Sequence, residues 1–536
     1  MGKDIERRDF LKLSGAGGVA LASSLGSLLT ACGGGSDDAP GTPPPAPVPA
    51  PPAPVPGPPP APVPAPPPAP APPPPAPVPA PAPTSPAPPP PPPSSAKSIT
   101  AFSFLRADNA IAVDSDATIG GSTIQVFLPP GTDLSALKAR FDVAPQATVR
   151  VGSVVQTSQV SVNDFSRPVS YTVTAQDGSV AGYTVVLITD LAAFDDTVQS
   201  FMARYAVPAV SIAVTKDDKL VYVKSYGQAD REAGQAATNQ SLYRLASVSK
   251  PITSVAIMRL VEQGSLRLSD TVFGASGILG TDFGTLPYGP HITEITVQHL
   301  LQHAAGGWAN DDDDPMFSNP AMTAAQLISW TLANRPLQNV PGSAYAYSNF
   351  GYCLLGRVIE KVTGQGYEAA VKALVLTPLG VSDMTIAGNT LAQRLPGEVK
   401  YYGQYGEDPY SFNIHRMDSH GGWVATARDL AALLVRVDGF AGKPDILQSA
   451  TLATMTRPST VNLNYGCGWA VNSSDNWWHQ GSLPGTATEI LRTARGWNFV
   501  MLANTRSLLS TYDSDLDSTF WTSFAALGAY PTYDLF

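Results

Sequence analysis

The chain has 536 residues, and this length predicts two or three domains rather than a single packed core. Hydrophobic residues make up 43% of the sequence, whereas charged residues make up 14% and the formal net charge is −10. The acidic balance argues against nucleic-acid binding, because contacts to phosphates require clustered Lys and Arg side chains. The three cysteines form neither a disulfide framework nor a zinc-binding spacing.

Residues 1–32 have the features of a bacterial export signal. Arg7 and Arg8 stand near the start, and a weakly apolar stretch rich in Gly and Ser follows them. This pattern resembles a twin-arginine signal, and its end, Leu-Thr-Ala-Cys, resembles a lipobox whose Cys32 is lipidated. Several acyl chains on one residue anchor a protein stably, so we expect a lipoprotein on a bacterial membrane, periplasmic or at the cell surface. An ordinary signal peptide with an incidental Cys32 is the alternative.

Residues 33–97 form a linker rich in Pro and Ala. From Pro40 to Pro93 the sequence is almost entirely Pro, Ala and Val and carries no charge. No core can form from this composition, and it predicts an extended polyproline spacer with a rise of about 3.1 Å per residue. Such a spacer would hold the next domain on the order of 150 Å from Cys32. A ligand for Pro-binding domains is the alternative, but the position just after Cys32 favours a spacer.

Residues 98–190 show short alternating apolar runs that predict a small all-β sandwich. The runs at 169–175 and 182–188 flank Asp177-Gly178, which is a hairpin signal, and another run covers 123–128. The segment resembles the immunoglobulin-like domains of bacterial surface proteins. It contains no catalytic constellation. A spacer or packing module is the preferred role, and contact with glycan or cell wall in the envelope is the alternative.

Residues 191–536 alternate between strand and helix patterns. Hairpins are predicted around Asp217-Asp218 and around Arg495-Gly496. Between and after them, the sequence predicts helices at 252–262, 352–362, 430–437 and 513–527. Thr426 with Asp429 forms a capping box before the third of these helices. Strands at both ends with helices between them predict an α/β architecture whose sheet joins the two ends of the domain.

The first candidate motif is Ser247-Val248-Ser249-Lys250, just before the predicted helix at Ile252. Residues three apart share one helix face, so Ser247 and Lys250 should lie side by side. A serine hydroxyl is a weak nucleophile that needs a base, and a Lys pressed against apolar neighbours loses its proton more easily. The helix N-terminus would also favour an oxyanion at Ser247. A capped helix start without a catalytic role is the alternative for this motif alone.

The second candidate motif is Tyr347-Ser348-Asn349, on a predicted turn. A phenol near a cationic Lys can carry a proton to or from Ser247. The Asn349 amide can orient Lys250 and bind a substrate carbonyl. A plain surface turn is the alternative, since Tyr-Ser-Asn is common in loops.

The third candidate motif is His479-Gln480-Gly481-Ser482, on a predicted strand. Gly481 would let a substrate backbone approach the strand edge closely. The backbone N–H of Ser482 could pair with that of Ser247 as an oxyanion hole. For His479, the alternative is a hydrogen-bonded core histidine beside two tryptophans.

The order and spacing of these motifs resemble those of serine β-lactamases and penicillin-binding proteins. The resemblance is closest to the class C-like branch, which includes DD-peptidases, D-aminopeptidases and β-lactamase-like esterases. Further matching stretches lie at 295–306, 347–356 and 421–430, so the resemblance covers nearly all of 191–536. It implies a two-lobe α/β domain in which an antiparallel sheet is flanked by helices and joined to an all-helical lobe.

The resemblance also implies roles for individual residues. Ser247 would form the acyl-enzyme, Lys250 and Tyr347 would move protons, and Asn349 would position the substrate. The stretch from His479 through Gly481 to Ser482 would line the substrate strand and supply the oxyanion hole. No cofactor is implied.

The chain departs from the class C pattern at His479, where β-lactamases of that class carry Lys and the peptidase and esterase members carry His. The Glu motif that deacylates class A enzymes is absent, which leaves Tyr347 as the candidate for activating water. We therefore expect a carboxylesterase or a D-amino-acid-type peptidase or amidase, acting on a small ester, amide or peptide. The alternatives are a β-lactamase and a non-catalytic sensor of cell-wall peptides or β-lactams.

The sequence contains three further features: a pair of histidines, an acidic run and two cysteines. His299 and His303 are four residues apart, but no HExxH glutamate accompanies them, so no metal site is predicted and His303 is expected to brace the loop after it. The acidic run 310–314 predicts a solvated loop that would favour cationic substrates if it lined the pocket. Cys353 and Cys467 are predicted to be buried free thiols, with a disulfide as the alternative.

Overall fold

The computed structural model describes residues 92–189, 191–311, 313–524 and 530–536. The predicted export signal, Cys32, the linker up to residue 91 and the end of the predicted C-terminal helix at 525–527 lie outside the described residues. Among the described residues, no helix is both long enough and apolar enough to cross a lipid bilayer.

The first described part is built from strands alone. Eight strands are hydrogen-bonded in the order β5-β1-β2-β3-β10-β9-β6-β7, and β4 pairs with β8 separately. The strands are β1 (Ile99–Phe104), β2 (Ser115–Gly120), β3 (Thr123–Phe127), β4 (Leu137–Lys138), β5 (Arg140–Val143), β6 (Thr148–Val151), β7 (Val154–Val155), β8 (Val162–Asn163), β9 (Val169–Thr174) and β10 (Val180–Ile188).

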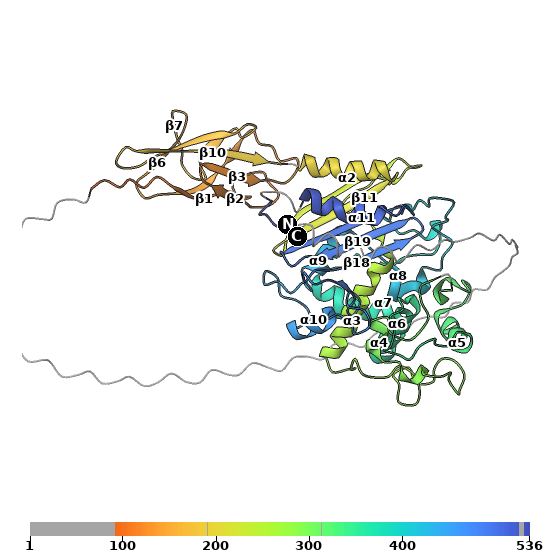
Figure 1. Cartoon of the computed structure of the whole chain (residues 1–536). Helices are drawn as coiled ribbons and strands as arrows, with labels where there is room; N and C mark the ends of the chain where they lie inside the picture. Colours follow the sequence, from red (N-terminus) through yellow and green to blue (C-terminus); the bar gives the residue numbers. More distant parts are fainter. Residues whose placement is uncertain (1–91, 190, 312, 525–529) are drawn as a thin grey trace, which may run out of the picture. The chain divides into compact units, whose positions relative to one another are not determined.

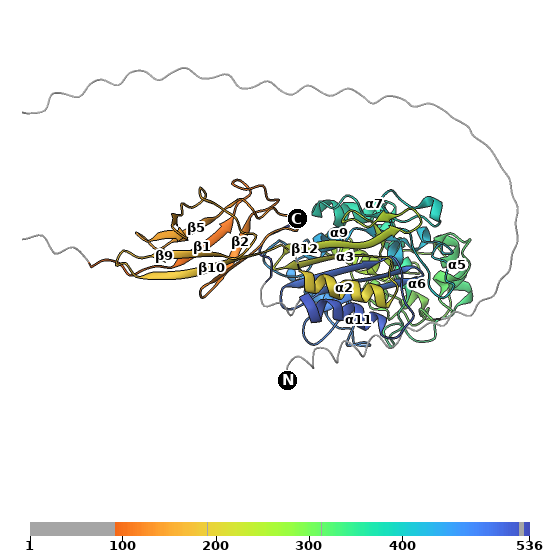
Figure 2. The same ribbon diagram turned by 90° about the horizontal axis from the view of Figure 1, so that it is seen from above.

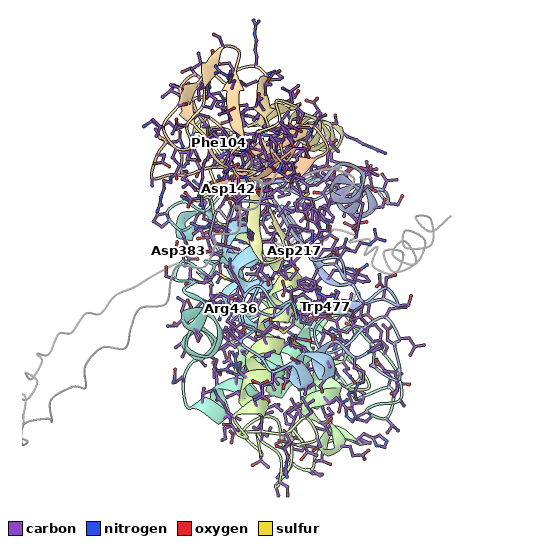
Figure 3. All side chains as sticks on the ribbon, turned by 90° about the vertical axis from the view of Figure 1, so that its left-hand side faces the viewer. Phe104, Asp142, Asp217, Asp383, Arg436 and Trp477 are labelled. Atoms are coloured by element: carbon purple, nitrogen blue, oxygen red, sulfur yellow. The ribbon has the colours of Figure 1, made fainter. Side chains whose placement is uncertain are left out.

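An aromatic cluster forms the core of this part. The Phe102 ring on β1 lies 5.4 Å from the Tyr171 ring on β9, and Phe104 lies 5.1 Å from Phe165, measured between ring centroids. Because β1 and β9 stand far apart in the strand order, these contacts fold the sheet over its own apolar face. Phe104 is labelled in Figure 3. The predicted all-β sandwich is therefore confirmed.

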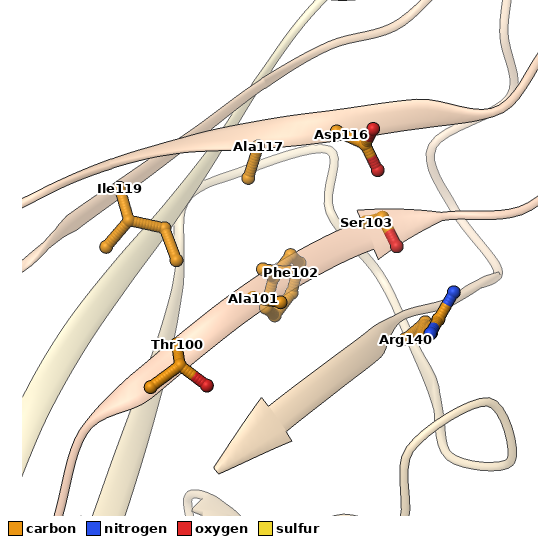
Figure 4. Close-up of a pocket in the computed structure, with 8 residues that line it drawn as sticks. All are labelled: Thr100, Ala101, Phe102, Ser103, Asp116, Ala117, Ile119 and Arg140. Carbon is orange, nitrogen blue, oxygen red and sulfur yellow. The ribbon is translucent and has the colours of Figure 1, made fainter.

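The predicted hairpin around Asp177-Gly178 is present, with Thr174 opposite Val180 across the turn. Strand β10 also pairs with β3, and this pairing is parallel. A depression of about 390 Å³ opens on the sandwich between β1, β2 and β5, with Thr100, Asp116 and Arg140 among its lining residues (Figure 4).

The second part combines one large sheet with helices. Its strands are β11 (Ala209–Lys216), β12 (Lys219–Asp230), β13 (Gln235–Ala236), β14 (Tyr243–Arg244), β15 (Thr385–Ile386), β16 (Trp423–Ala425), β17 (Ala470–Val471), β18 (Trp477–Leu483), β19 (Thr486–Arg492) and β20 (Trp497–Ala503). Its helices are α2 (Ala192–Arg204), α3 (Ser249–Glu262), α4 (Val297–Leu301), α5 (Ala324–Asn334), α6 (Asn349–Thr363), α7 (Tyr367–Val371), α8 (Asp418–Gly421), α9 (Ala427–Leu434), α10 (Ser449–Thr456) and α11 (Tyr512–Thr519), with short 3-10 turns η1 (Ala246–Val248) and η3 (Pro315–Phe317).

The large sheet is antiparallel and has the strand order β13-β12-β11-β20-β19-β18-β17. Strands from the beginning and the end of this second part meet at the centre of the sheet, where Ile212 of β11 lies opposite Met501 of β20. Helices α2 and α11 cover one face of the sheet (Figures 1 and 2). Helix α9 and the helical lobe, which consists of α3, α4, α5, α6, α7 and α10, adjoin the other face. The prediction that the sheet joins the two ends of the domain is confirmed.

The predicted hairpins and capping box are present, and two helices begin earlier than predicted. Both predicted hairpins are present, and Thr426 and Asp429 form the predicted capping box at the start of α9. Helices α3 and α6 begin about three residues earlier than predicted. For α6 the reason is local, because the side chain of Ser348 caps the helix by accepting a hydrogen bond from Gly351 N–H.

Candidate active site

Ser247 lies in η1, between the short strand β14 and helix α3. The backbone N–H of Leu245 donates to the Trp423 carbonyl, which joins this segment to β16. Ala246, directly before Ser247, has a φ of +47°. A left-handed conformation is costly for a residue with a Cβ, so the surrounding structure must hold this turn in place. The strained turn presents Ser247 at the start of α3.

Lys250 lies one turn further along, and its side chain is fully buried. Its Nζ is 2.9 Å from Ser247 Oγ, 2.7 Å from Asn349 Oδ1 and 3.2 Å from the His420 carbonyl oxygen. These partners are uncharged oxygens, and the burial lowers the pKa of Lys250 to about 7. A large fraction of Lys250 is therefore a neutral amine near neutral pH and can accept the Ser247 proton.

Tyr347 joins the same cluster from the loop before α6. Its phenol is hydrogen-bonded to Ser247, and its ring centroid lies 4.7 Å from Lys250 Nζ. Burial raises the pKa of Tyr347, so the phenol is neutral at physiological pH. It can relay a proton between Ser247 and the substrate, while Lys250 is the group able to take that proton up. The structure thus brings the first two motifs together at Ser247.

Asn349, the first residue of α6, contacts Lys250 on one side and Asp314 on the other. Its Oδ1 accepts from Lys250 Nζ, and its Nδ2 donates to Asp314 Oδ2 over 2.8 Å. The expectation of a fully solvated acidic loop at 310–314 is therefore wrong for Asp314, which is 2% exposed. Nothing in the local sequence distinguishes Asp314 from its acidic neighbours; the following Pro315, at the start of η3, is the one hint of an N-cap.

Strand β18 brings the third motif against Ser247. Strand β17 pairs with Trp477 and Trp478 at the start of β18, and no strand of the described part of the chain pairs with the outer edge of β18 from His479 onward. A Cβ atom on Gly481 would lie 2.3 Å from the Leu245 carbonyl oxygen and 3.1 Å from Ser247 N. Only glycine permits this close approach, which accounts for the Gly in the motif.

His479 is held as a neutral side chain by a chain of hydrogen bonds. Ser348 N–H donates to His303 Nδ1 over 3.0 Å, so His303 carries its proton on Nε2, which lies 3.2 Å from Tyr465 Oη. The Tyr465 hydroxyl can then donate to His479 Nε2 over 3.0 Å, and His479 Nδ1–H donates to the Gln480 carbonyl over 2.7 Å. Burial lowers the pKa of His479 to about 3.

These hydrogen bonds correct the expectation for His303 and add Tyr465 to the candidate site. His303 accepts a hydrogen bond from the second motif, whereas the sequence predicted that it would brace the loop directly after it. Tyr465 had no predicted role, and it links residues of the second and third motifs through the two imidazoles. His299 instead forms a capping box with Thr296 at the start of α4.

Ser482 is exposed and contacts a charged pair at the rim of the site. Arg506 Nη1 donates to Ser482 Oγ over 3.1 Å, and the same guanidinium forms an ion pair with Glu407. No motif or periodicity in the sequence points to Arg506 or Glu407. The guanidinium beside the third motif is therefore already paired with a carboxylate.

The state of the two buried cysteines was also predicted. Cys353 and Cys467 are both buried and free, which confirms the predicted thiols. Within the described part of the chain, no group of three or more His, Cys, Asp and Glu side chains could hold a metal ion. Proton transfer and nucleophilic attack by the residues around Ser247 are the chemistry that this site can carry out.

Comparison with known proteins agrees with the geometry. A family model described as Beta-lactamase matches residues 194–518, and one described as SGBP, N-terminal, matches residues 99–187. Esterase EstB of Burkholderia gladioli is 35% identical over 201 residues, which are 34% of this chain and 48% of EstB. The chain thus matches about half of the length of EstB.

Two other proteins are similar over a larger share of their length. A protein of Escherichia coli K12, provisionally named D-alanyl-D-alanine carboxypeptidase, is 27% identical over 50% of this chain and 69% of its own length. The structure of D-amino acid amidase from Ochrobactrum anthropi SV3 complexed with D-phenylalanine has a TM-score of 0.51 at 22% identity, covering 62% of this chain and 97% of the amidase. The predicted β-lactamase-like α/β fold is confirmed.

The pKa of Lys250 sets an expected pH dependence. The amine must be neutral to accept the Ser247 proton, so acylation should be slow at pH 5 and should rise with pH to a midpoint near 7. The measurement is the rate of Ser247 labelling by a fluorophosphonate between pH 5 and pH 9, with Ser247→Ala as the unlabelled control. A labelling rate that still rises about tenfold between pH 8 and pH 9, as for an ordinary Lys that titrates near 10, would contradict a role for the buried amine as the base.

Proposed function

Because the chain belongs to the beta-lactamase family and is a serine hydrolase, we propose that it acts as a carboxylesterase on small uncharged esters. The observation that carries this proposal is the 2.9 Å contact between Ser247 Oγ and the buried Lys250 amine, beside a neutral His479 at the third motif. The resemblance to EstB, which is named as an esterase, supports the same class.

The reaction follows from the contacts of Ser247. Neutral Lys250 takes the hydroxyl proton as Ser247 Oγ attacks the ester carbonyl, and the backbone N–H groups of Ser247 and Ser482 stabilise the oxyanion. The proton passes to the leaving alkoxide through Tyr347, and an acyl-enzyme remains. A water molecule then attacks the acyl carbonyl and gives its proton to Lys250, because the raised pKa of Tyr347 keeps that phenol from acting as the base that sequence analysis expected. As the bond between the acyl carbon and Ser247 Oγ breaks, Lys250 returns this proton to Ser247 Oγ and the carboxylic acid leaves.

The charges around the third motif favour an uncharged substrate. A substrate carboxylate binds best to an unpaired cation. His479 is neutral, and Arg506 is already paired with Glu407. A β-lactam antibiotic carries a carboxylate beside its reactive ring, so this environment supports an ester more than a β-lactam.

A substrate panel tests the proposal. We expect turnover of p-nitrophenyl butyrate, at least about a hundredfold weaker turnover of nitrocefin, and loss of ester turnover by a factor of about 10³ or more in Ser247→Ala. Steady-state kinetics on purified protein give these ratios. Nitrocefin turnover equal to that of the ester would favour the β-lactamase alternative, and stable labelling by a fluorescent penicillin without any turnover would favour a sensor.

A D-amino-acid-type peptidase or amidase is the second candidate, and Arg506 is the observation that favours it. Its guanidinium lies 3.1 Å from Ser482 Oγ at the rim of the site, where the terminal carboxylate of a peptide could exchange with Glu407. The Escherichia coli relative, provisionally named D-alanyl-D-alanine carboxypeptidase, supports this class.

Opposite changes in the Arg506 pair separate the two candidates. If peptides are substrates, Arg506→Gln should lower kcat/KM for a D-Ala-D-Ala peptide about tenfold relative to an uncharged ester, because one charged hydrogen bond is lost. Glu407→Gln should change the same ratio in the opposite direction, since it frees the guanidinium. An unchanged ratio in both variants would exclude a carboxylate subsite at Arg506.

We also propose that the hydrolase is exported and tethered to a bacterial membrane through lipidated Cys32, with the Pro/Ala-rich linker as a spacer. The lipobox-like end of the N-terminal segment supports this proposal. In a bacterial host, Cys32→Ala should move the protein from the membrane fraction to the soluble fraction and abolish labelling by a radioactive fatty acid. Fractionation and autoradiography measure both effects, and a variant that stays lipidated or membrane-bound would contradict the anchor.

A further inference from the structure

Both carboxylate oxygens of Asp314 accept hydrogen bonds inside the protein, unlike those of Asp311 and Asp313, the two other acidic residues of this loop that the structure describes. Its Oδ1 accepts from Met316 N–H over 2.8 Å and caps η3, while its Oδ2 accepts from Asn349 Nδ2 over 2.8 Å. Asp311 and Asp313, by contrast, are exposed. One carboxylate of the acidic run therefore faces the cluster around Lys250.

This contact determines the orientation of the Asn349 amide. An ionised carboxylate can only accept hydrogen bonds, so the NH₂ group of Asn349 must face Asp314. The amide oxygen must then face the opposite way, where it lies 2.7 Å from Lys250 Nζ. A flipped amide would set its oxygen against the Asp314 carboxylate, where neither group can donate, and would leave a protonated Lys250 without this acceptor.

We propose that Asp314 is a positioning residue of the acyl-enzyme reaction: its carboxylate fixes the Asn349 amide, whose oxygen holds the Lys250 amine against Ser247 Oγ. This inference rests on the proposed serine-hydrolase mechanism and assigns a part of its machinery that contacts no substrate. The link crosses three elements, since Asp314 precedes η3, Asn349 begins α6 and Lys250 lies on α3.

The charge of Asp314 acts on Lys250 in addition to this geometry. The nearby carboxylate stabilises the ammonium form and partly offsets the lowering of the Lys250 pKa by burial. Burial raises the pKa of Asp314 itself to about 6, so the carboxylate is mostly ionised where Lys250 titrates. Among the described residues, the charged and titratable groups that interact with Lys250 or Asp314 are Asp311, Arg416, His303, His420, His479, Tyr347 and Tyr352.

The first test compares two isosteric changes in the same acidic run. Asp314→Asn removes the charge and one acceptor, so we expect the maximal rate of Ser247 labelling by a fluorophosphonate to fall about tenfold. We also expect the acid limb of the pH profile to move to lower pH, because Lys250 loses a stabilising negative charge. Asp313→Asn removes an equal charge at an exposed position and should leave the profile unchanged.

The second test exchanges the two side chains. In Asp314→Asn with Asn349→Asp, the new amide at 314 can donate to the carboxylate at 349, and that carboxylate can accept from Lys250. We expect the labelling rate to recover at least partly, with the acid limb at higher pH than in Asp314→Asn alone, since the negative charge now touches Lys250. Circular dichroism and thermal unfolding identify any variant that fails to fold.

The outcomes separate this inference from the proposed function. If Asp314→Asn folds and changes neither the rate nor the pH profile, the positioning role is wrong. If it lowers the rate but leaves the acid limb in place, and the exchange does not recover the rate, Asp314 only supports the loop and the inference is again wrong. Labelling does not require ester turnover, so failure of the wild-type protein to hydrolyse esters would contradict the carboxylesterase and leave this test valid.

Discussion

The site depends on the burial of one Lys side chain among uncharged oxygens. A buried ammonium is costly unless a counter-charge touches it, and such groups reduce this cost by losing their proton. Lys250 is fully buried, and its hydrogen bonds go to a hydroxyl, an amide oxygen and a backbone carbonyl. The same apolar packing that stabilises the helical lobe therefore prepares a base at neutral pH.

The elements around Lys250 place uncharged groups next to its amine. The strained turn at Ala246 sets Ser247 beside the amine, and α6 begins so that Asn349 faces it. Strand β18 approaches from the sheet, and its Gly481 lies against the Ser247 backbone because no Cβ fits there. Each element contributes a neutral donor or acceptor, so the amine keeps its lowered proton affinity while the serine is held within hydrogen-bond distance.

Local sequence signals accounted for much of the fold and for part of the site. The hairpins and the Thr426 capping box were predictable because each depends on residues only a few positions apart. Ser247, Lys250, Tyr347 and Asn349 could be found because their residue types and spacing resemble a family. Asp314 and Tyr465 could not, because their contacts join segments 35 and 162 residues apart and neither motif nor periodicity encodes such a pairing.

The neutral side chain of His479 affects how strongly the site attracts an anionic substrate. In a site with a cationic Lys at this position, an anionic substrate would be attracted by that charge. Here His479 accepts from Tyr465 and donates to a backbone carbonyl, so protonation would break a hydrogen bond in a fully buried network. Both this hydrogen-bond network and the desolvation of the buried ring therefore oppose protonation of His479. Under the proposed function, substrate selection then depends on uncharged contacts around Ser247 and on Arg506, which is paired with Glu407 beside Ser482.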